Sequence, residues 1–201
     1  MFELIGEAFS ARWALIGAGA IFHYVGAEVA IGAQMALFLN AEGIWGISLQ
    51  QAGALVSCYW AGAFAGRLVG SALLYRFKVH LLLMLFTAMA ALMCLYLFGV
   101  GGITAGYVAL VIGLVNSIMF PVVFTLTLER STASEEAISA MLCTGIVGGA
   151  AVPFVLGAVS EVSSYGFAFI VPAGCYALLC LFAVTAGRSA PIHRSSARTV
   201  H

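Results

Sequence analysis

Six apolar runs, each long enough to cross a lipid bilayer, make up most of this chain. They lie at about residues 13–38, 50–74, 79–100, 103–128, 137–160 and 164–186. A helix of about 20 residues crosses the ~30 Å hydrocarbon layer. The runs lack the period-two alternation of a lipid-facing barrel, and in lipid each segment must satisfy its own backbone polar groups. The sequence therefore predicts an all-α integral membrane protein with six transmembrane helices over residues 13–186.

Composition excludes several classes of function. Charged residues make up 8% of the 201 residues and hydrophobic residues 63%, whereas a soluble domain carries about 25% charged residues. A net charge of zero argues against nucleic-acid binding, which needs a positive excess. The motifs GxSxG, GxxxxGK[ST] and HExxH are absent from the sequence, so we do not expect an enzyme. The five cysteines lie in apolar runs without CxxC spacing, and we expect buried thiols with no metal and no cofactor.

Basic residues are distributed unevenly between the two sets of connections. Seven of the eight precede span one, follow span six, or lie between spans two and three or four and five: Arg12, Arg76, Lys78, Arg130, Arg188, Arg194 and Arg198. The connections 39–49, 101–102 and 161–163 contain none. The positive-inside rule then predicts a multi-pass protein of the inner or plasma membrane with both termini cytoplasmic. Residues 1–12 form a cytoplasmic segment that does not resemble a signal peptide, and residues 187–201 a basic tail that we expect to be disordered.

Glu28 is the most informative polar residue. It lies about 15 residues into the first span and about 10 from its end, roughly 22 Å and 15 Å from the two faces. An ionised carboxylate at that depth costs at least ~2.5–3.5 kcal/mol on insertion scales. We therefore expect Glu28 to face a wet cavity, to pair with a cation, or to carry a proton. It could bind a substrate, carry a transported proton, or only pin one helix to another. Tyr24, one turn earlier, lies on the same helix face.

Two further polar residues inside the spans leave alternatives open. Asn116 in span four cannot satisfy its amide group on its own helix, so it either faces a cavity or packs in a polar contact. Arg67 lies about seven residues from the cytoplasmic end of span two. Its side chain could snorkel to the interface, bind helix-end carbonyls, or pair with a carboxylate across a gate. We favour a structural or gating role for Arg67 over substrate contact.

Small residues and prolines recur within the spans. Most of the 23 glycines lie there, and small residues spaced four apart allow helices to pack closely. Pro121, Pro153 and Pro172 also lie inside spans. Each removes one backbone hydrogen bond, so we expect bent helices at these positions.

Four stretches of the sequence carry a resemblance to a known family. They are YVGAEV at 24–29, YWAG at 59–62 followed by GR at 66–67 and LYRF at 74–77, NSIMFP at 116–121, and the set Gly148, Gly149, Pro153, Gly157, Ser160 and Glu161. In order and spacing they resemble the C-terminal six helices of a major facilitator superfamily transporter, of the fucose–galactose–glucose:proton symporter family. The resemblance covers about residues 13–186.

The resemblance implies a fold and a function. The fold would be a 3+3 inverted repeat, half of a twelve-helix architecture. The function would be secondary active transport of a hexose sugar, as a proton symport by alternating access, with a sodium-coupled variant left open. Glu28 and Asn116 would contact sugar hydroxyls, Tyr24 or Trp60 would line or stack on the sugar, and Arg67 would support the cytoplasmic gate.

The chain also departs from the family pattern. Its first span resembles the family's seventh helix, so we expect the N-terminal half, which in the family carries the proton-coupling carboxylates, to be missing from this chain. The link between spans two and three lacks the acidic residue of the family's gating loop. We expect a partner, either an N-terminal six-helix half or a second copy. The alternatives are a non-transporting remnant or membrane assembly subunit, and a six-helix pore working alone.

Overall fold

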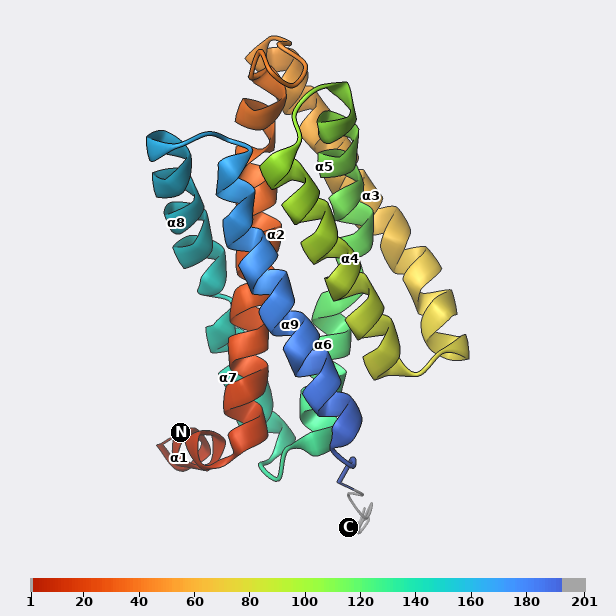
Figure 1. Cartoon of the computed structure of the whole chain (residues 1–201). Coiled ribbons are helices and arrows are strands. Elements are labelled where there is room, and N and C mark those ends of the chain that lie inside the picture. Colours follow the sequence, from red (N-terminus) through yellow and green to blue (C-terminus); the bar gives the residue numbers. More distant parts are fainter. Residues whose placement is uncertain (1, 193–201) are drawn as a thin grey trace.

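The computed structural model describes residues 2–192 and is all-helical over them (Figure 1). Six helical segments are long and apolar enough to cross a membrane, which confirms the six predicted spans. The elements are α1 (Phe2–Ser10), α2 (Arg12–Asn40), α3 (Leu49–Arg76), α4 (Val79–Gly99), α5 (Ile103–Asn116), α6 (Met119–Arg130), α7 (Glu135–Gly145), α8 (Gly148–Val162), the 3-10 turn η1 (Phe167–Phe169) and α9 (Ile170–Arg188). Most of the predicted tail, residues 193–201, lies outside the described residues, so its predicted disorder stays a prediction.

Spans four and five are each built from two helices separated by a short break. In span four, α5 ends at Asn116 and α6 begins at Met119. Pro121 lacks the N–H that would bond the carbonyl of Ser117, and its ring crowds that carbonyl, so the break lies where the proline predicts it. In span five, Ile146 and Val147 donate to carbonyls three residues earlier, which is the tighter 3-10 pattern. Pro153 lies farther along, inside α8.

The first span, α2, is the central helix of the bundle. It packs against α3, α6, α7, α8 and α9 (Figure 1). Close approach depends on glycines that meet backbone atoms of a neighbouring helix. A Cβ on Gly148 would clash with the carbonyl of Phe22 in α2, and a Cβ on Gly113 would clash with the carbonyl of Tyr59 in α3. These two contacts fix how closely spans five and four can pack against their neighbours.

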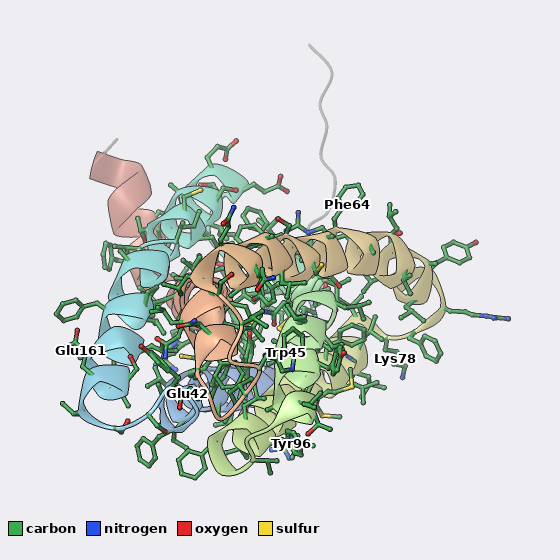
Figure 2. All side chains as sticks on the ribbon, turned by 90° about the horizontal axis from the view of Figure 1, so that it is seen from above. Glu42, Trp45, Phe64, Lys78, Tyr96 and Glu161 are labelled. Atoms are coloured by element: carbon green, nitrogen blue, oxygen red, sulfur yellow. The ribbon has the colours of Figure 1, made fainter. Side chains whose placement is uncertain are left out.

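The outer surface of the bundle is strongly apolar. In α3, Phe64 is 67% exposed and Leu68 is 64% exposed, and Figure 2 shows Phe64 pointing away from the bundle. Phe154 on α8 is 80% exposed. Apolar side chains of this size spread over the helix surfaces would be unfavourable in water and are satisfied by lipid. The protein is therefore a multi-pass membrane protein.

The connections separate into two ends of the molecule. The α3–α4 and α6–α7 connections lie at the same end as α1 and the end of α9, which we call the basic end (Figure 1). The α2–α3, α4–α5 and α8–α9 connections lie at the opposite end (Figure 1), and Figure 2 shows the molecule from that end. This arrangement places Lys78 and the helix-end residues Arg12, Arg76, Arg130 and Arg188 at one end. The first span starts there and the last span ends there, as an even number of spans requires.

A short helix precedes the first span and was not predicted from the sequence. The carboxylate of Glu7 in α1 accepts hydrogen bonds from the backbone N–H of Ser134 at 2.6 Å and from its hydroxyl at 2.8 Å. Ser134 is also the N-cap of α7, where its Oγ accepts from the N–H of Ala137. The helix α1 is therefore tied to the start of span five, a long-range contact that local sequence patterns do not reveal.

Candidate functional site

An open cavity lies beside the middle of α2. Its volume is about 460 Å³ and its lining combines three polar side chains with an apolar wall: Tyr24, Val25, Glu28, Arg67, Phe120, Pro121 and Ile146. Cavities that bind small molecules commonly measure ~300–1,000 Å³ and carry few polar groups among apolar ones. The cavity therefore has the size and the chemistry of a small-molecule site.

Glu28 supplies the acidic group of this cavity. Its residue is 9% exposed, and its Oε1 atom is buried without a hydrogen-bond partner. A buried carboxylate oxygen without a hydrogen-bond partner is unfavourable, so such an atom commonly binds a ligand, a proton or a water molecule. The position fits the predicted cavity and leaves a hydrogen-bonding site free for a ligand.

Arg67 reaches the same cavity from α3. Arg67 and Glu28 line this cavity together but form no ion pair; among the described residues, the ion pair within 4 Å joins Arg130 and Glu129. The Glu28 carboxylate and the Arg67 guanidinium thus face the same cavity without forming an ion pair. The sequence indicated a gate or an interface position for Arg67 and did not predict this neighbour. Its gating role stays a prediction.

Tyr24 forms a wall of the cavity rather than a free surface. The residue is 1% exposed, and its hydroxyl donates to the backbone carbonyl of Asn116 at 3.2 Å. Its ring packs against Phe120 with centroids 6.2 Å apart. The predicted lining role of Tyr24 fits this geometry, whereas stacking on a sugar face would need a more exposed ring.

Asn116 lies behind the cavity and does not line it. The residue is fully buried, its Nδ2 donates to the Tyr59 hydroxyl at 3.0 Å, and its Oδ1 accepts from the Tyr176 hydroxyl at 2.7 Å. Because the amide is buried and its Nδ2 and Oδ1 each have a protein partner, it does not face a sugar in this conformation. The geometry matches the packing alternative and gives no support to the expected substrate contact.

Trp60 also lies outside the cavity lining. Its indole packs over Gly32 of α2 and meets Tyr59 edge to face, with centroids 5.1 Å apart. The residue is 45% exposed, so part of the ring remains open at the surface of the bundle. Contact between Trp60 and a sugar in the Glu28 cavity is not supported by this geometry.

Sequence reasoning missed the apolar wall of the cavity. Phe120 and Pro121 line it from α6, and Ile146 lines it from the break in span five. The first two belong to the NSIMFP stretch, so that stretch was the available signal. Ile146 carried no signal, because its placement depends on how span five bends.

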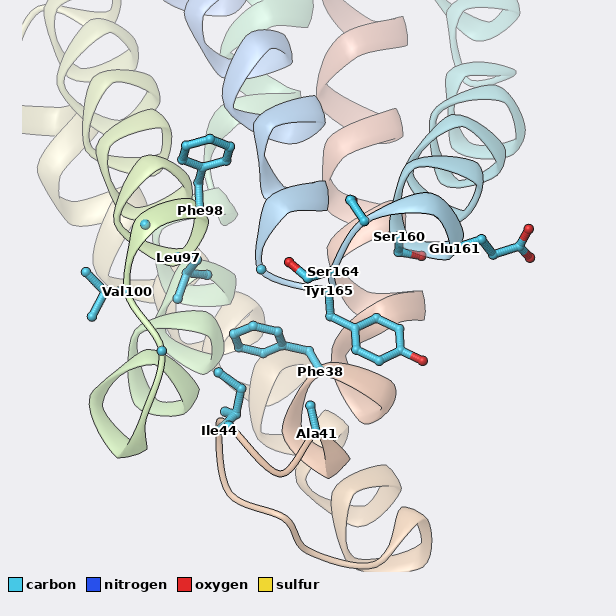
Figure 3. A pocket seen from close by; sticks show the side chains of 15 residues that line it. Phe38, Ala41, Ile44, Leu97, Phe98, Val100, Ser160, Glu161, Ser164 and Tyr165 are labelled. Atoms are coloured by element: carbon cyan, nitrogen blue, oxygen red, sulfur yellow. The ribbon is translucent and has the colours of Figure 1, made fainter.

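A larger recess at the opposite end is a weaker candidate. It measures about 610 Å³ and lies between the ends of α2, α4 and α8 (Figure 3). Ser160 and Ser163 donate to carbonyls of their own helix, and Ser164 accepts from the N–H of Phe167. Figure 3 shows Glu161 pointing away from the recess. The polar groups are therefore already satisfied or directed elsewhere, and the Glu28 cavity remains the candidate site.

Curated relatives match this chain along most of its length. A glucose/galactose transporter of Brucella abortus is 36% identical over 188 residues, which cover 92% of this chain and 45% of the relative. A putative glucose/galactose transporter of Helicobacter pylori is 35% identical over 183 residues, or 88% of this chain and 44% of the relative. The L-fucose-proton symporter of Escherichia coli is 30% identical over 174 residues, covering 86% and 39%. No protein-family model matches the chain.

Solved structures match the fold. The major facilitator superfamily transporter FucP in an outward conformation aligns with a TM-score of 0.82 and 27% identity, covering 87% of this chain and 42% of that one. A variant of the Escherichia coli fucose:proton symporter FucP aligns with a TM-score of 0.84 and 25% identity, covering 91% and 45%. The chain thus spans about half the length of the curated relatives it matches. By sequence and by fold, the chain is similar to one six-helix half of sugar transporters of the major facilitator superfamily.

Proposed function

We propose that this chain is the C-terminal half of a proton-coupled hexose transporter, and that the Glu28 cavity contributes to the sugar site. The observation that carries the proposal is the buried, unpartnered Oε1 of Glu28 in an open cavity about 460 Å³ in volume. The names of the relatives, glucose/galactose transporter and L-fucose-proton symporter, indicate the substrate class and the coupling ion. Sodium is the alternative coupling ion that we left open from the sequence.

The chemistry of the cavity favours a neutral polyhydroxy ligand. The carboxylate of Glu28 accepts hydrogen bonds from sugar hydroxyls, and hydrogen bonds to charged groups are the stronger ones. Phe120 and Pro121 cover the apolar face of a sugar ring. Because Glu28 and Arg67 face the same cavity, their charges offset one another, and the ligand need not carry a charge of its own.

A second half is required to close the site. The cavity opens at the surface of the bundle, and a free side in the membrane would expose Glu28 to hydrocarbon at a cost of ~2.5–3.5 kcal/mol or more. An N-terminal six-helix half would cover this opening and supply the coupling carboxylates, and a second copy of the chain is the other candidate partner. The assembled protein would show whether the exposed ring of Trp60 contacts the sugar and whether Arg67 supports the cytoplasmic gate. We also expect the six helices to form a 3+3 inverted repeat.

Equilibrium binding tests the proposed sugar site. The chain would be produced together with the segment of the Brucella abortus relative that it does not match, and the purified complex titrated with glucose, galactose and fucose by calorimetry. We expect saturable binding of at least one hexose. Xylitol, an open-chain polyol, serves as a control for weak nonspecific binding. A well-folded complex that binds none of the three sugars would remove the hexose assignment.

Topology can be tested separately from transport. We expect both termini and the basic end to lie on the cytoplasmic side of a bacterial inner membrane, because the basic residues gather at that end of the molecule. Single cysteines at Glu42 and Lys78, which are both exposed, would be placed in a background that lacks the native cysteines. An impermeant thiol reagent added to intact cells should label the first position and spare the second. The reverse pattern would show that the orientation is wrong.

A further inference from the structure

Behind the Glu28 cavity, four buried side chains form a hydrogen-bonded network that the proposed function does not yet use. Tyr24, Tyr59, Tyr176 and Asn116 are each at most 1% exposed. They come from α2, α3, α9 and the last residue of α5, so the network joins four helices. A buried network of this kind stabilises one arrangement strongly when every group is satisfied, and each missing partner is costly in a medium of low dielectric constant.

The hydrogen bonds of this network run in one direction. The hydroxyl of Tyr59 donates to the backbone carbonyl of Glu28 at 3.1 Å, and a carbonyl can only accept. The same hydroxyl must therefore accept from Asn116, whose Nδ2 lies 3.0 Å away. The Asn116 Oδ1 then accepts from Tyr176 at 2.7 Å. The hydroxyls of Tyr59 and Tyr176 each have one proton to donate and one acceptor for it, so loss of one member would leave a neighbouring buried group without that partner.

The network also holds the break in span four. Asn116 is the last residue of α5, and its backbone carbonyl accepts the hydroxyl of Tyr24. The break packs tightly on α3, because a Cβ on Gly66 would clash with Ser117 and with the carbonyl of Leu114. Phe120 and Pro121, which begin only four residues after Asn116, form the apolar wall of the cavity. The position of that wall therefore depends on how the break is held.

Glu28 belongs both to the cavity and to the hydrogen-bonded network. Its carboxylate lines the cavity, and its backbone carbonyl is the final acceptor of the network. The network thus connects the acidic side of the cavity to the break that positions the apolar side.

We propose that Asn116, Tyr59 and Tyr176 are positioning residues, which set the gap between the Glu28 carboxylate and the Phe120–Pro121 wall without touching the ligand. The part of this inference that concerns sugar rests on the proposed function. The part that concerns the geometry of the cavity stands on the contacts alone.

Tyr59→Phe is the sharpest variant, because it keeps the ring and removes only the hydroxyl. It removes the hydrogen bond that the Glu28 carbonyl accepts in addition to its bond within α2, and it removes the partner of the Asn116 Nδ2. We expect amide hydrogen exchange in purified chain to accelerate about five- to tenfold in peptides covering residues 24–32 and 117–122, the factor that follows from losing about one net hydrogen bond. In a sugar-binding complex, the affinity should fall by a similar factor. Tyr96→Phe is the matched control, since its hydroxyl bonds Thr104 in an exposed pair, and both readouts should stay within about twofold of the unmodified protein.

Asn116→Asp tests the direction of the network. The new carboxylate cannot donate a hydrogen bond. We therefore expect the Tyr59 hydroxyl to donate to this carboxylate and no longer to the Glu28 carbonyl. Because Asn116→Asp and Tyr59→Phe remove the same bond to Glu28, the double variant should show no more exchange at residues 24–32 than the stronger single variant. Full additivity would overturn the proposed direction.

The outcomes separate this inference from the proposed function. If the unmodified complex binds no sugar, the proposed function fails, while exchange in the chain still decides the positioning role. Unchanged exchange at residues 24–32 in Tyr59→Phe overturns the positioning role whether or not sugar binds. Accelerated exchange with unchanged sugar affinity in a binding complex overturns it as well, because the cavity would then not depend on the network.

Discussion

Replacing Glu28 with glutamine in the assembled transporter is expected to weaken sugar binding by about one to two orders of magnitude. The substitution keeps the shape of the side chain and one acceptor but removes the charge, and a hydrogen bond to a charged group contributes about 1.5–3 kcal/mol. Glu28→Ala should weaken binding further, because it leaves a void and an unpaired sugar hydroxyl. Calorimetry on the purified complex measures both affinities.

The same two variants separate three roles for Glu28. Loss of affinity in both indicates hydrogen bonding to the sugar, which is the result we expect. If Glu28 carries the coupled proton, Glu28→Gln should abolish accumulation driven by the gradient and spare exchange of sugar across the membrane. If Glu28 only pins helices, both variants should lower thermal stability and leave affinity unchanged. Unchanged affinity of well-folded Glu28→Ala complex would remove Glu28 from the sugar site.

Gly113→Ala is expected to prevent normal assembly of the helical bundle. A Cβ at this position would meet the backbone carbonyl and the ring of Tyr59, and backbone atoms cannot turn away as a flexible side chain can. Inserting atoms into a tightly packed contact costs about 1–3 kcal/mol, and more where the neighbour is backbone. The displaced Tyr59 would also leave the network around Asn116. We expect low yield and a lower melting temperature of the purified chain in detergent.

Gly174→Ala provides the matched control for this prediction. It also lies within a helix, but nothing stands within 4 Å of the added Cβ. Alanine favours a helix over glycine by about 1 kcal/mol, so the melting temperature should be unchanged or slightly higher. If Gly113→Ala melted at the same temperature as Gly174→Ala, the close contact between α3 and α5 would be wrong.

The sequence predicts the spans well because their signal is local. Length and hydropathy decide whether a segment crosses the bilayer, and both can be read within one run of residues. The break in span four is also local, since Pro121 removes a backbone hydrogen bond to Ser117. The helix α1 is different, because it is tied to the protein by Glu7 and the distant Ser134.

The candidate site is only partly predictable for the same reason. Glu28 stands out by its depth in an apolar helix, and that signal needs no knowledge of other helices. Arg67 joins it only because α3 packs against α2 in one register, which the sequence of either helix does not specify. Asn116 has three tyrosine partners that come from three other helices. The choice between cavity and packing for Asn116 therefore depends on tertiary contacts.

Uptake of labelled hexose into liposomes tests most directly whether this chain acts as one half of a sugar transporter. The chain would be reconstituted alone and together with the complementary segment of the Brucella abortus relative, with an inward proton gradient and with or without a protonophore. The paired protein should show saturable uptake of glucose, galactose or fucose that the protonophore abolishes, and the chain alone should show none. Saturable, protonophore-sensitive uptake by the chain as a monomer, or no uptake by a well-folded pair, would contradict the account.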